Sequence, residues 1–346
     1  MKRILFTGGG SAGHVTPNIA LIEAFLQSGE ADVCYMGTSG IEKTMIAALK
    51  IPYYTLECPK LIRSFSWKNF GIPHAFQKAV KEAKKGLTIA APDVVFSKGG
   101  FVSLPVAIAA EKLGIPVLTH ESDLSAGLSN KLMARRCKHV LTSFPETAEK
   151  FKNGKFVGSP IRQNIFLGDR AEAAKKYGFD LKNGRKRILV FGGGSGSQFL
   201  NEAVRKCLPT LSKEYDILHV TGRGNVREAR FEGYRQIEFE TDMGGAYAVC
   251  DLVISRAGSN TVFEILALKK PAILVPLEGQ TRGDQAENAR YFEKKGLVRI
   301  LAQKDAQFLP EAVKDAFSDE RLKDNLAVSS YSSGTENILR EIRAFL

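Results

Sequence analysis

One pattern occurs twice in this chain and constrains its fold more than any other feature. Residues 3–13 read RILFTGGGSAG, and residues 187–197 read RILVFGGGSGS. In each copy an apolar run typical of a buried strand meets a glycine cluster where the backbone can turn sharply, and helical spacing of apolar residues follows. Two such starts predict an α/β chain of two doubly wound domains, whose loops face a central cleft. The alternative is a pair of unrelated glycine-rich turns.

The glycine loops also indicate what kind of group the chain could bind. Backbone N–H groups at the start of a helix, with no side chains in the way, can face an anion or a substrate oxygen. His14 ends the first loop, at the mouth of the expected site, although it could equally cap or pack. A second glycine pair, Gly99-Gly100, follows a strand expected at 93–96. The strand expected at 115–119 ends in residues 120–123, HESD, which can bind sugar hydroxyls or assist proton transfer, or can simply be a polar loop.

Composition narrows the partners. The chain has 346 residues and a formal charge of +12, which favours anionic partners such as phosphorylated substrates, an acidic membrane face or nucleic acid. No window holds eighteen consecutive apolar residues and no signal-peptide pattern opens the chain, so we expect a cytoplasmic protein that does not span the membrane. The five cysteines are scattered singly, which argues against disulfides and a zinc site.

Residues 60–86 interleave large apolar and basic side chains, including the single Trp of the chain. This composition suits the headgroup boundary of an anionic bilayer and predicts a peripheral membrane patch. The bland alternative is an ordinary helix with a solvated basic face. Nucleic acid is not expected as a partner, because no RNA-binding motif accompanies the aromatic residues. The predicted patch comprises Leu61, Ile62, Phe65, Trp67, Lys68 and Phe70.

Five motifs in order resemble one family. They are GGGSAGHVTP, FSKGGFVSLPV, the HESD loop with SAGLSNK, SRAGSNTVFE and GDQAENA. Together they are similar to the MurG family of bacterial peptidoglycan glycosyltransferases, over nearly the whole chain. The resemblance implies the GT-B fold of two Rossmann-like domains, and inverting transfer of N-acetylglucosamine from UDP-GlcNAc to the 4-hydroxyl of MurNAc in lipid I, giving lipid II.

The resemblance implies roles for residues of the N-terminal domain, which in the family binds the lipid-linked acceptor. His14 becomes the candidate general base, with Glu121 as a second catalytic candidate. The family docks on the inner face of the cell membrane through a patch of the kind expected at 61–70. The implied acceptor-binding residues are Gly9, Gly10, Gly99, Gly100 and Asn130.

Further positions match the family's donor site. In the family, an Arg near the domain boundary approaches the diphosphate, a Glu binds the ribose, and an Asp-Gln pair meets the sugar; here these are Arg162, Glu264, Asp284 and Gln285. The full set of implied donor-binding residues is Ser11, Ala12, Gly13, Asp123, Arg162, Gly194, Ser195, Glu240, Met243, Gly258, Ser259, Asn260, Glu264, Asp284 and Gln285.

Two motifs depart from the family pattern. Many members read GGSQGA where this chain reads GGGSGS, so Gly194 takes the usual Ser position and Ser195 follows it. Many members read HEQN where this chain reads HESD, so Asp123 replaces an Asn. An ionised Asp accepts hydrogen bonds but cannot donate them, which leaves the sugar contacts open.

The predicted organisation is an acceptor- and membrane-binding domain at 1–160, a UDP-GlcNAc-binding domain at 161–330, and a final helix within 331–346 that crosses back to the first domain. No Asp-x-Asp pair ends a strand, so we expect neither a catalytic metal nor a cofactor. Two alternatives stay open: a GT-B transferase with another lipid acceptor, such as diacylglycerol, and a non-catalytic sugar-nucleotide-binding paralogue.

Overall fold

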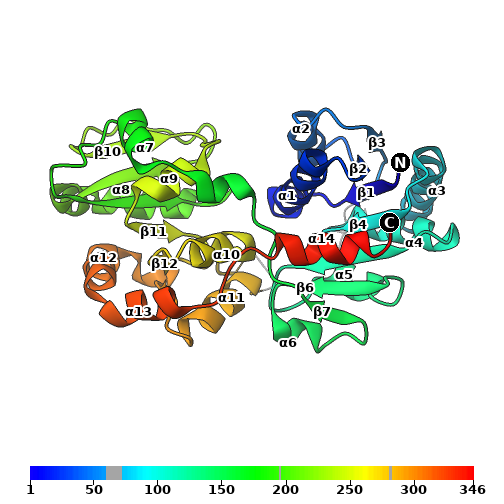
Figure 1. The fold of residues 1–346 in the computed structure, drawn as a ribbon. Coiled ribbons are helices and arrows are strands. Elements are labelled where there is room, and N and C mark those ends of the chain that lie inside the picture. The colour runs from blue at the N-terminus through cyan, green and yellow to red at the C-terminus, as the bar shows by residue number, and fades with distance from the viewer. Residues whose placement is uncertain (60–71, 195, 280–282) are drawn as a thin grey trace. The chain divides into compact units, whose positions relative to one another are not determined.

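The computed structural model describes residues 1–346 except 60–71, 195 and 280–282. The chain forms two compact units (Figure 1): residues 1–162 together with 333–346, and residues 163–332. The first unit is therefore discontinuous in sequence, and the second is continuous. The predicted membrane patch at residues 61–70 lies outside the described residues.

The first unit is built on a sheet whose seven described strands are all parallel, in the order β3-β2-β1-β4-β5-β6-β7. The order reverses at β1, which lies between β2 and β4. In open parallel sheets a reversal of this kind opens a crevice at the carboxyl ends of the strands. The strands are β1 (Arg3–Thr7), β2 (Asp32–Gly37), β3 (Tyr53–Thr55), β4 (Val94–Ser97), β5 (Val117–Glu121), β6 (His139–Thr142) and β7 (Gly154–Phe156).

Helices cover both faces of this sheet, because successive side chains of a strand point to opposite faces. Ile4 and Phe6 of β1 enter one buried cluster, and Leu5 between them enters another. The first cluster includes side chains of α1, α2 and α14, and the second those of α3, α4 and α5. The helices of this unit are α1 (Ala12–Ser28), α2 (Ile41–Ala47), α3 (Ile72–Ala90), α4 (Ser103–Lys112), α5 (Leu128–Met133), α6 (Pro145–Ala148) and α14 (Thr335–Arg343).

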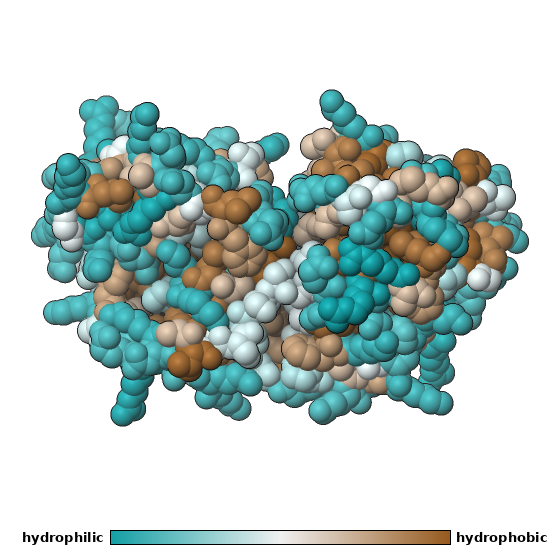
Figure 2. Space-filling view, viewed as in Figure 1, coloured by the Kyte–Doolittle hydropathy of each residue, from teal (hydrophilic) through white to brown (hydrophobic). Residues whose placement is uncertain are grey.

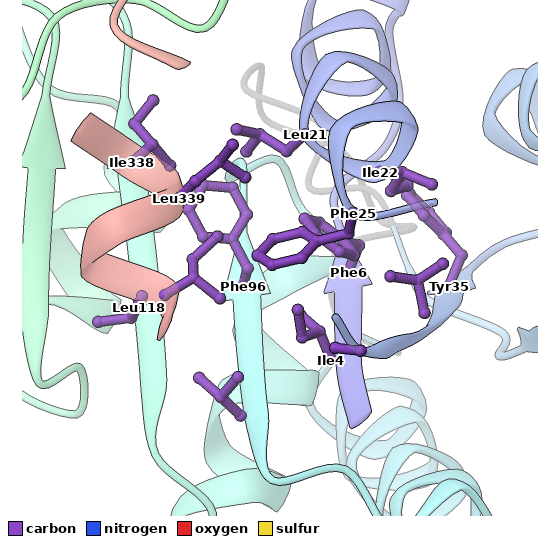
Figure 3. Close-up of a cluster of buried hydrophobic side chains, with 14 of the residues drawn as sticks. Ile4, Phe6, Leu21, Ile22, Phe25, Tyr35, Phe96, Leu118, Ile338 and Leu339 are labelled. Atoms are coloured by element: carbon purple, nitrogen blue, oxygen red, sulfur yellow. The ribbon is translucent and has the colours of Figure 1, made fainter. Parts of the chain in front are cut away.

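Helix α14 completes the core of the first unit. Ile338 and Leu339 lie in the same buried cluster as Phe6 and Phe25 (Figure 3). Backbone contacts anchor the helix start: the N–H of Gly334 donates to the carbonyl of Ser159 at 2.8 Å. The last helix is therefore an integral part of the first unit.

The second unit repeats the design with six described parallel strands in the order β10-β9-β8-β11-β12-β13. The strand order reverses at β8, which contains the same RIL sequence as β1. The strands are β8 (Lys186–Phe191), β9 (Tyr215–Val220), β10 (Tyr234–Ile237), β11 (Leu252–Ser255), β12 (Ala272–Leu274) and β13 (Arg299–Ile300). The α-helices are α7 (Arg170–Tyr177), α8 (Gln198–Glu214), α9 (Met243–Val249), α10 (Ser259–Ala267), α11 (Asp284–Glu293), α12 (Leu309–Ser318) and α13 (Glu320–Val328).

The predicted α/β class with two doubly wound sheets is confirmed, while several element boundaries differ. Helix α1 begins at Ala12, directly after the glycine loop, and contains Pro17. Strands β6 and β7 were not expected from the sequence. The chain after residue 308 forms three separate helices, α12, α13 and α14. Among the described residues, no helix combines the length and apolar character needed to cross a bilayer.

Candidate functional site

Two glycine loops meet at the reversal point of the first sheet. Gly9 and Gly10 follow β1, and Gly99 and Gly100 follow the neighbouring β4. A Cβ atom on Gly100 would lie 2.4 Å from the carbonyl oxygen of Gly9, and the φ of Gly100 is +86°. Only glycine fits such a close approach in that backbone conformation. The structure thus brings the predicted acceptor glycines together in one place.

Buried residues that the sequence analysis did not identify hold the glycine loop after β1 in place. The carboxylate of Glu42, which is buried, accepts hydrogen bonds from the N–H groups of Gly10 at 3.4 Å and Thr38 at 3.0 Å. The hydroxyl of Tyr35 donates to the carbonyl of Gly8 at 2.6 Å. The Gly10 N–H therefore points into the protein. A glutamate at the start of a short helix carries no sequence signal for this role, because it is ordinarily exposed.

The first loop leads into α1 through Ser11, which is the residue preceding the helix. Its hydroxyl does not cap the helix; instead Oγ lies 2.9 Å from Nδ1 of His14. Ser11 and Gly13 are exposed, while Ala12 and His14 are half-buried. The hydrogen bond to Ser11 fixes the orientation of the imidazole at the helix start.

Glu121, at the end of β5, organises the loop that follows. Its carboxylate accepts from the N–H of Asp123 at 3.0 Å, the N–H of Gly127 at 2.8 Å and the Nδ2 of Asn130 at 2.8 Å. The Oδ1 of Asn130 accepts in turn from the hydroxyl of Thr119 at 2.9 Å. Both Glu121 and Asn130 are buried. Their geometry is that of a scaffold for the turn, whereas Asp123 is half-buried on the turn itself.

Arg162 is the last residue of the first unit in this part of the chain. Its Nε is buried and has no hydrogen-bond partner among the described residues. An unpaired buried guanidinium nitrogen is costly, so such a group marks a place where an anionic ligand is favourable. Burial raises the pKa of Glu23 in α1, and the positive charge of Arg162 partly opposes that rise.

In the second unit, the loop after β8 approaches its neighbours as closely as the first loop does. A Cβ on Gly196, whose φ is +76°, would lie 2.4 Å from the carbonyl oxygen of Thr221. Gly194 is exposed. The predicted phosphate contact Ser195 lies outside the described residues. Helix α8, which follows this loop, is capped by Ser197, whose Oγ accepts a hydrogen bond from the N–H of Leu200 at 3.3 Å.

Arg256, at the turn after β11, joins this loop to its neighbours. Its Nε donates to Oγ of Ser197 at 3.0 Å, and its Nη1 donates to the carbonyl of Val275 at 3.0 Å and to Oε1 of Gln303 at 2.7 Å. The guanidinium also lies over the ring of Phe199, 5.3 Å from its centroid. The loops after β8, β11 and β12 are thereby connected through one buried cation. The sequence pattern SRAGSN pointed to the turn but not to this role.

Glu240 follows β10 and has a fully occupied carboxylate. It accepts from Nζ of Lys176 at 2.7 Å, the hydroxyl of Tyr177 at 2.6 Å and the N–H of Asp242 at 2.7 Å. Burial opposes ionisation of Glu240, but these hydrogen bonds prevail and its pKa is lowered. The side chain thus fixes the turn that leads to Met243, the first residue of α9.

The remaining predicted donor residues lie at two further helix starts. Helix α10 begins after Gly258, with Ser259 and Asn260 in its first turn and Glu264 one turn later. Helix α11 begins at Asp284, and Oε1 of Gln285 accepts from the N–H of Leu277 at 3.0 Å. Because parallel strands end at the same edge of a sheet, these turns share the edge that carries the loop after β8. The structure thus divides the predicted donor residues between the units: Ser11, Ala12, Gly13, Asp123 and Arg162 belong to the first.

Comparison with known proteins identifies both units. The glycosyltransferase family 28 N-terminal domain matches residues 4–142, and the glycosyltransferase family 28 C-terminal domain matches residues 187–338. A Clostridium perfringens protein named UDP-N-acetylglucosamine–N-acetylmuramyl-(pentapeptide) pyrophosphoryl-undecaprenol N-acetylglucosamine transferase is 42% identical over 351 residues, covering 99% of this chain and 98% of that protein. A Bacillus cereus protein of the same name, numbered 2, is 44% identical over 88% of both chains.

Solved structures agree on the fold. MurG from Acinetobacter baumannii matches with a TM-score of 0.77 and 24% identity, covering 99% of this chain and 100% of that one. A UDP-GlcNAc 2-epimerase from Neisseria meningitidis matches with a TM-score of 0.69 and 13% identity over 99% of this chain and 100% of that one. At these identities the structures show the GT-B fold alone. From its sequence identity to the named transferases over almost its whole length, the chain belongs to the MurG family of glycosyltransferases.

Proposed function

We propose that this protein transfers N-acetylglucosamine from UDP-GlcNAc to the 4-hydroxyl of MurNAc in lipid I, giving lipid II for peptidoglycan synthesis. The observation that carries the proposal is the identity of 42%, over 99% of the chain, to a relative named for this transfer. That name specifies a pyrophosphoryl-undecaprenol acceptor. It therefore favours this activity over a diacylglycerol transferase and over a non-catalytic paralogue.

In the proposed reaction His14 is the general base. Oγ of Ser11 lies 2.9 Å from Nδ1 and orients the ring, and an imidazole suits the role because its unperturbed pKa lies near neutrality. Nε2 takes the proton of the acceptor 4-hydroxyl as that oxygen forms a bond to the anomeric carbon. The bond between the anomeric carbon and the UDP oxygen breaks on the opposite face, so the sugar is transferred with inversion and UDP leaves.

The proposed donor site uses the helix starts of the second unit and Arg162. N–H groups at Gly194, Gly258, Ser259 and Asn260 are suited to the diphosphate, because helix N-termini favour negative charge. Glu264 accepts hydrogen bonds from the ribose hydroxyls, while Asp284 and Gln285 bind the donor sugar. Ser195 lies outside the described residues and remains a sequence prediction. The unpaired buried Nε supports a phosphate-binding role for Arg162.

On the acceptor side, we assign the two glycine loops of the first unit to the pyrophosphate and sugar of lipid I. The close contact of Gly9 and Gly100 supports a shared role. Glu121 and Asn130 act through the loop that they hold, because the hydrogen bonds that Glu121 accepts from Asp123, Gly127 and Asn130 all serve that loop. The family resemblance counts Asp123 among the donor contacts; because it lies on this turn, which Glu121 holds, we propose that it meets the acceptor sugar instead.

The proposed reaction needs no metal ion or cofactor. Among the described residues, no three His, Cys, Asp or Glu side chains gather where a metal ion could be held. The charge that develops on UDP is offset instead by Arg162 and the helix N-termini. Transfer should therefore continue at an unchanged rate in excess EDTA, and loss of transfer that added Mg²⁺ restores would contradict this part of the proposal.

We further propose that the protein works at the inner face of an anionic membrane. Helix α5 exposes Leu128 (58%) and Leu132 (48%), one turn apart; the exposed cations are Lys131 in the helix and Arg135, which follows its end. Hydrophilic residues cover most of the face shown in Figure 2, and hydrophobic ones interrupt them in scattered patches. An apolar pair flanked by cations suits an anionic headgroup layer.

Sedimentation with vesicles tests the membrane proposal. The wild type should sediment with phosphatidylglycerol vesicles and less with phosphatidylcholine vesicles, and a Leu128→Ser, Leu132→Ser double variant should lose part of that binding. As a control, Leu181→Ser alters an exposed leucine of the second unit. Equal binding by the double variant and the wild type would remove α5 from the membrane contact.

The central experiment measures transfer of radiolabelled GlcNAc from UDP-GlcNAc to a short-chain lipid I analogue, beside a diacylglycerol acceptor. Wild-type protein should label the lipid I analogue alone. The His14→Ala variant should bind both substrates and lose about 10²–10⁴-fold in kcat, the usual contribution of a positioned base. Near-normal turnover of that variant would exclude His14 as the base, and labelling of diacylglycerol alone would refute the proposed acceptor.

A further inference from the structure

One buried cation in the first unit has no role in the mechanism above. Lys98 follows directly after β4, and only 3% of it is exposed. Its ammonium makes hydrogen bonds with Nδ1 of His120, 2.8 Å away, and with Oγ of Ser122. A lysine is almost never fully buried unless it is paired, so its partners are informative.

The ammonium fixes the state of the histidine. A charged lysine can only donate, so Nδ1 of His120 must accept and the ring proton lies on Nε2. Nε2 then donates to the carbonyl of Gly158 at 2.9 Å. His120 is fully buried, and burial together with the nearby Lys98 charge lowers its pKa well below the usual value, so it stays neutral. One lysine thus selects one tautomer of the ring.

The surrounding charges keep this lysine in its cationic form near neutral pH. Burial lowers the pKa of Lys98 to about 8, and the carboxylates of Glu121 and Asp123 oppose that shift. Asp123 is the acidic residue that replaces an Asn of the common family pattern. The turn at residues 121–123 therefore lacks the amide donor of that Asn, and Lys98 supplies a hydrogen-bond donor and a positive charge to the same turn.

The same residue joins the Gly99-Gly100 loop to the turn at residues 121–123. Its backbone leads into Gly99-Gly100, and the carbonyl of Gly100 accepts from the hydroxyl of Ser129 at 2.7 Å. Its side chain holds Ser122. We propose that Lys98 is a positioning residue for the acceptor: its ammonium holds the Glu121–Asp123 turn in register with the Gly99-Gly100 loop, so that both present their groups to lipid I together. This inference rests on the proposed function.

The kinetic test compares two variants that break one contact from opposite ends. Lys98→Met keeps the length of the side chain and removes the ammonium, and Ser122→Ala removes its partner with little change in volume. Each should raise KM for the lipid I analogue about tenfold, the scale of a hydrogen bond to a charged group, and leave KM for UDP-GlcNAc within about twofold. The double variant should be no worse than Lys98→Met alone.

Lys112→Met, which alters an exposed lysine of α4, controls for the loss of one positive charge and should leave both KM values unchanged. The proposal is overturned if folded Lys98→Met and Ser122→Ala proteins keep the wild-type KM for the acceptor. Equal increases in both KM values would also overturn it, as would fully additive effects in the double variant, because each outcome separates Lys98 from the acceptor-side turn.

A second readout does not depend on turnover. Nitrogen-15 NMR of labelled histidine should show Nε2 of His120 protonated and Nδ1 unprotonated in the wild type, with loss of that single tautomer in Lys98→Met. The opposite tautomer in the wild type would refute the positioning role. If the wild type transfers no sugar to lipid I, the proposed function fails, and the tautomer still decides whether Lys98 holds the ring.

Discussion

The hydroxyl of Tyr247 in α9 lies 3.1 Å from Oε2 of Glu264 in α10 and donates a hydrogen bond to it. The phenol is 1% exposed, whereas Glu264 is half-buried. The two helices follow different strands, β10 and β11, so this bond fixes the proposed ribose-binding carboxylate relative to the neighbouring turn. A carboxylate that is already oriented loses less side-chain freedom when it binds two hydroxyls.

Replacing Tyr247 by Phe should weaken donor binding without altering the chemistry. We expect KM for UDP-GlcNAc to rise about tenfold, the scale of one hydrogen bond to a charged group, with kcat and the acceptor KM unchanged. Initial rates at varied donor concentration measure this effect. Glu264→Gln is the matched comparison and should raise the donor KM further, and an unchanged donor KM in Tyr247→Phe would show that the phenol does not orient the carboxylate.

The pair formed by Ser11 and His14 predicts a graded loss of activity. Removing the hydroxyl in Ser11→Ala leaves the imidazole in place but frees its orientation, so kcat should fall about tenfold, much less than in His14→Ala. Single-turnover rates at saturating substrates separate this loss from binding. A kcat loss in Ser11→Ala equal to that in His14→Ala would show that the hydroxyl does more than orient the ring.

Lys98 predicts a pH dependence of stability. The pKa of its ammonium falls from an ordinary value of 10.5 to about 8 in the folded protein. Between those values the unfolded chain binds more protons at this site than the folded one, so the free energy of unfolding rises with pH. The full shift corresponds to about 3 kcal/mol.

Urea unfolding of the wild type and Lys98→Met at several pH values isolates that contribution, because the variant keeps every other titrating group. Relative to the variant, the wild type should gain stability as the pH rises from about 8 to 10.5, and the gain should stop above that range. A constant difference across the range would mean that Lys98 titrates in the folded state as it does in the unfolded chain.

Gly114 and Gly100 both have left-handed backbones, so substituting each by Ala distinguishes the cost of backbone strain from the cost of a close contact. Gly114 has a φ of +72° and nothing within 4 Å of an added Cβ, whereas a Cβ on Gly100 would lie 2.4 Å from the carbonyl oxygen of Gly9. Gly114→Ala should cost about 1–2 kcal/mol of stability through the backbone alone. Gly100→Ala should cost more and should abolish transfer, because the two acceptor loops must move apart; thermal unfolding and the transfer assay check both expectations.

The return of α14 to the first unit predicts contrasting effects of two truncations in the same helix. Leu339 is buried among Phe6 and Phe25, so Leu339→Ala should lower the free energy of unfolding by about 2–5 kcal/mol. Arg343 forms an ion pair with Glu30 at 2.7 Å, but both side chains are well exposed, so Arg343→Ala should cost at most about 1 kcal/mol. Denaturation with urea distinguishes them, and similar losses would contradict this ranking.

The sequence predicted the architecture because the decisive signals are local. The repeated RIL and glycine pattern identifies β1 and β8, and alternation of side chains across a buried strand follows from backbone geometry. The missed strands β6 and β7 are short: Gly154–Phe156 offers three residues with no apolar run.

The site was predicted less completely, because several of its roles exist only in three dimensions. Lys98, Glu42 and Arg256 are charged residues that composition places at the surface, and only the fold shows that they are buried and hydrogen-bonded. Ser197 could have been found as the residue before α8, since serine is favoured at that position. The pairing of Tyr247 with Glu264 joins separate helices, which no spacing along the chain reveals.

The discontinuity of the first unit has a consequence for synthesis on the ribosome. Residues 1–162 emerge first, but the helix that supplies Ile338, Leu339 and Ile342 to their core is translated only after the whole of residues 163–332. The part of the nascent first sheet that α14 covers, beside α1 and α2, therefore stays exposed while the second unit, a continuous segment, already has all its residues. The unit that begins first along the chain is the last to obtain its full core, and for that interval the apolar side chains that pack against α14 are open to chaperones and to aggregation.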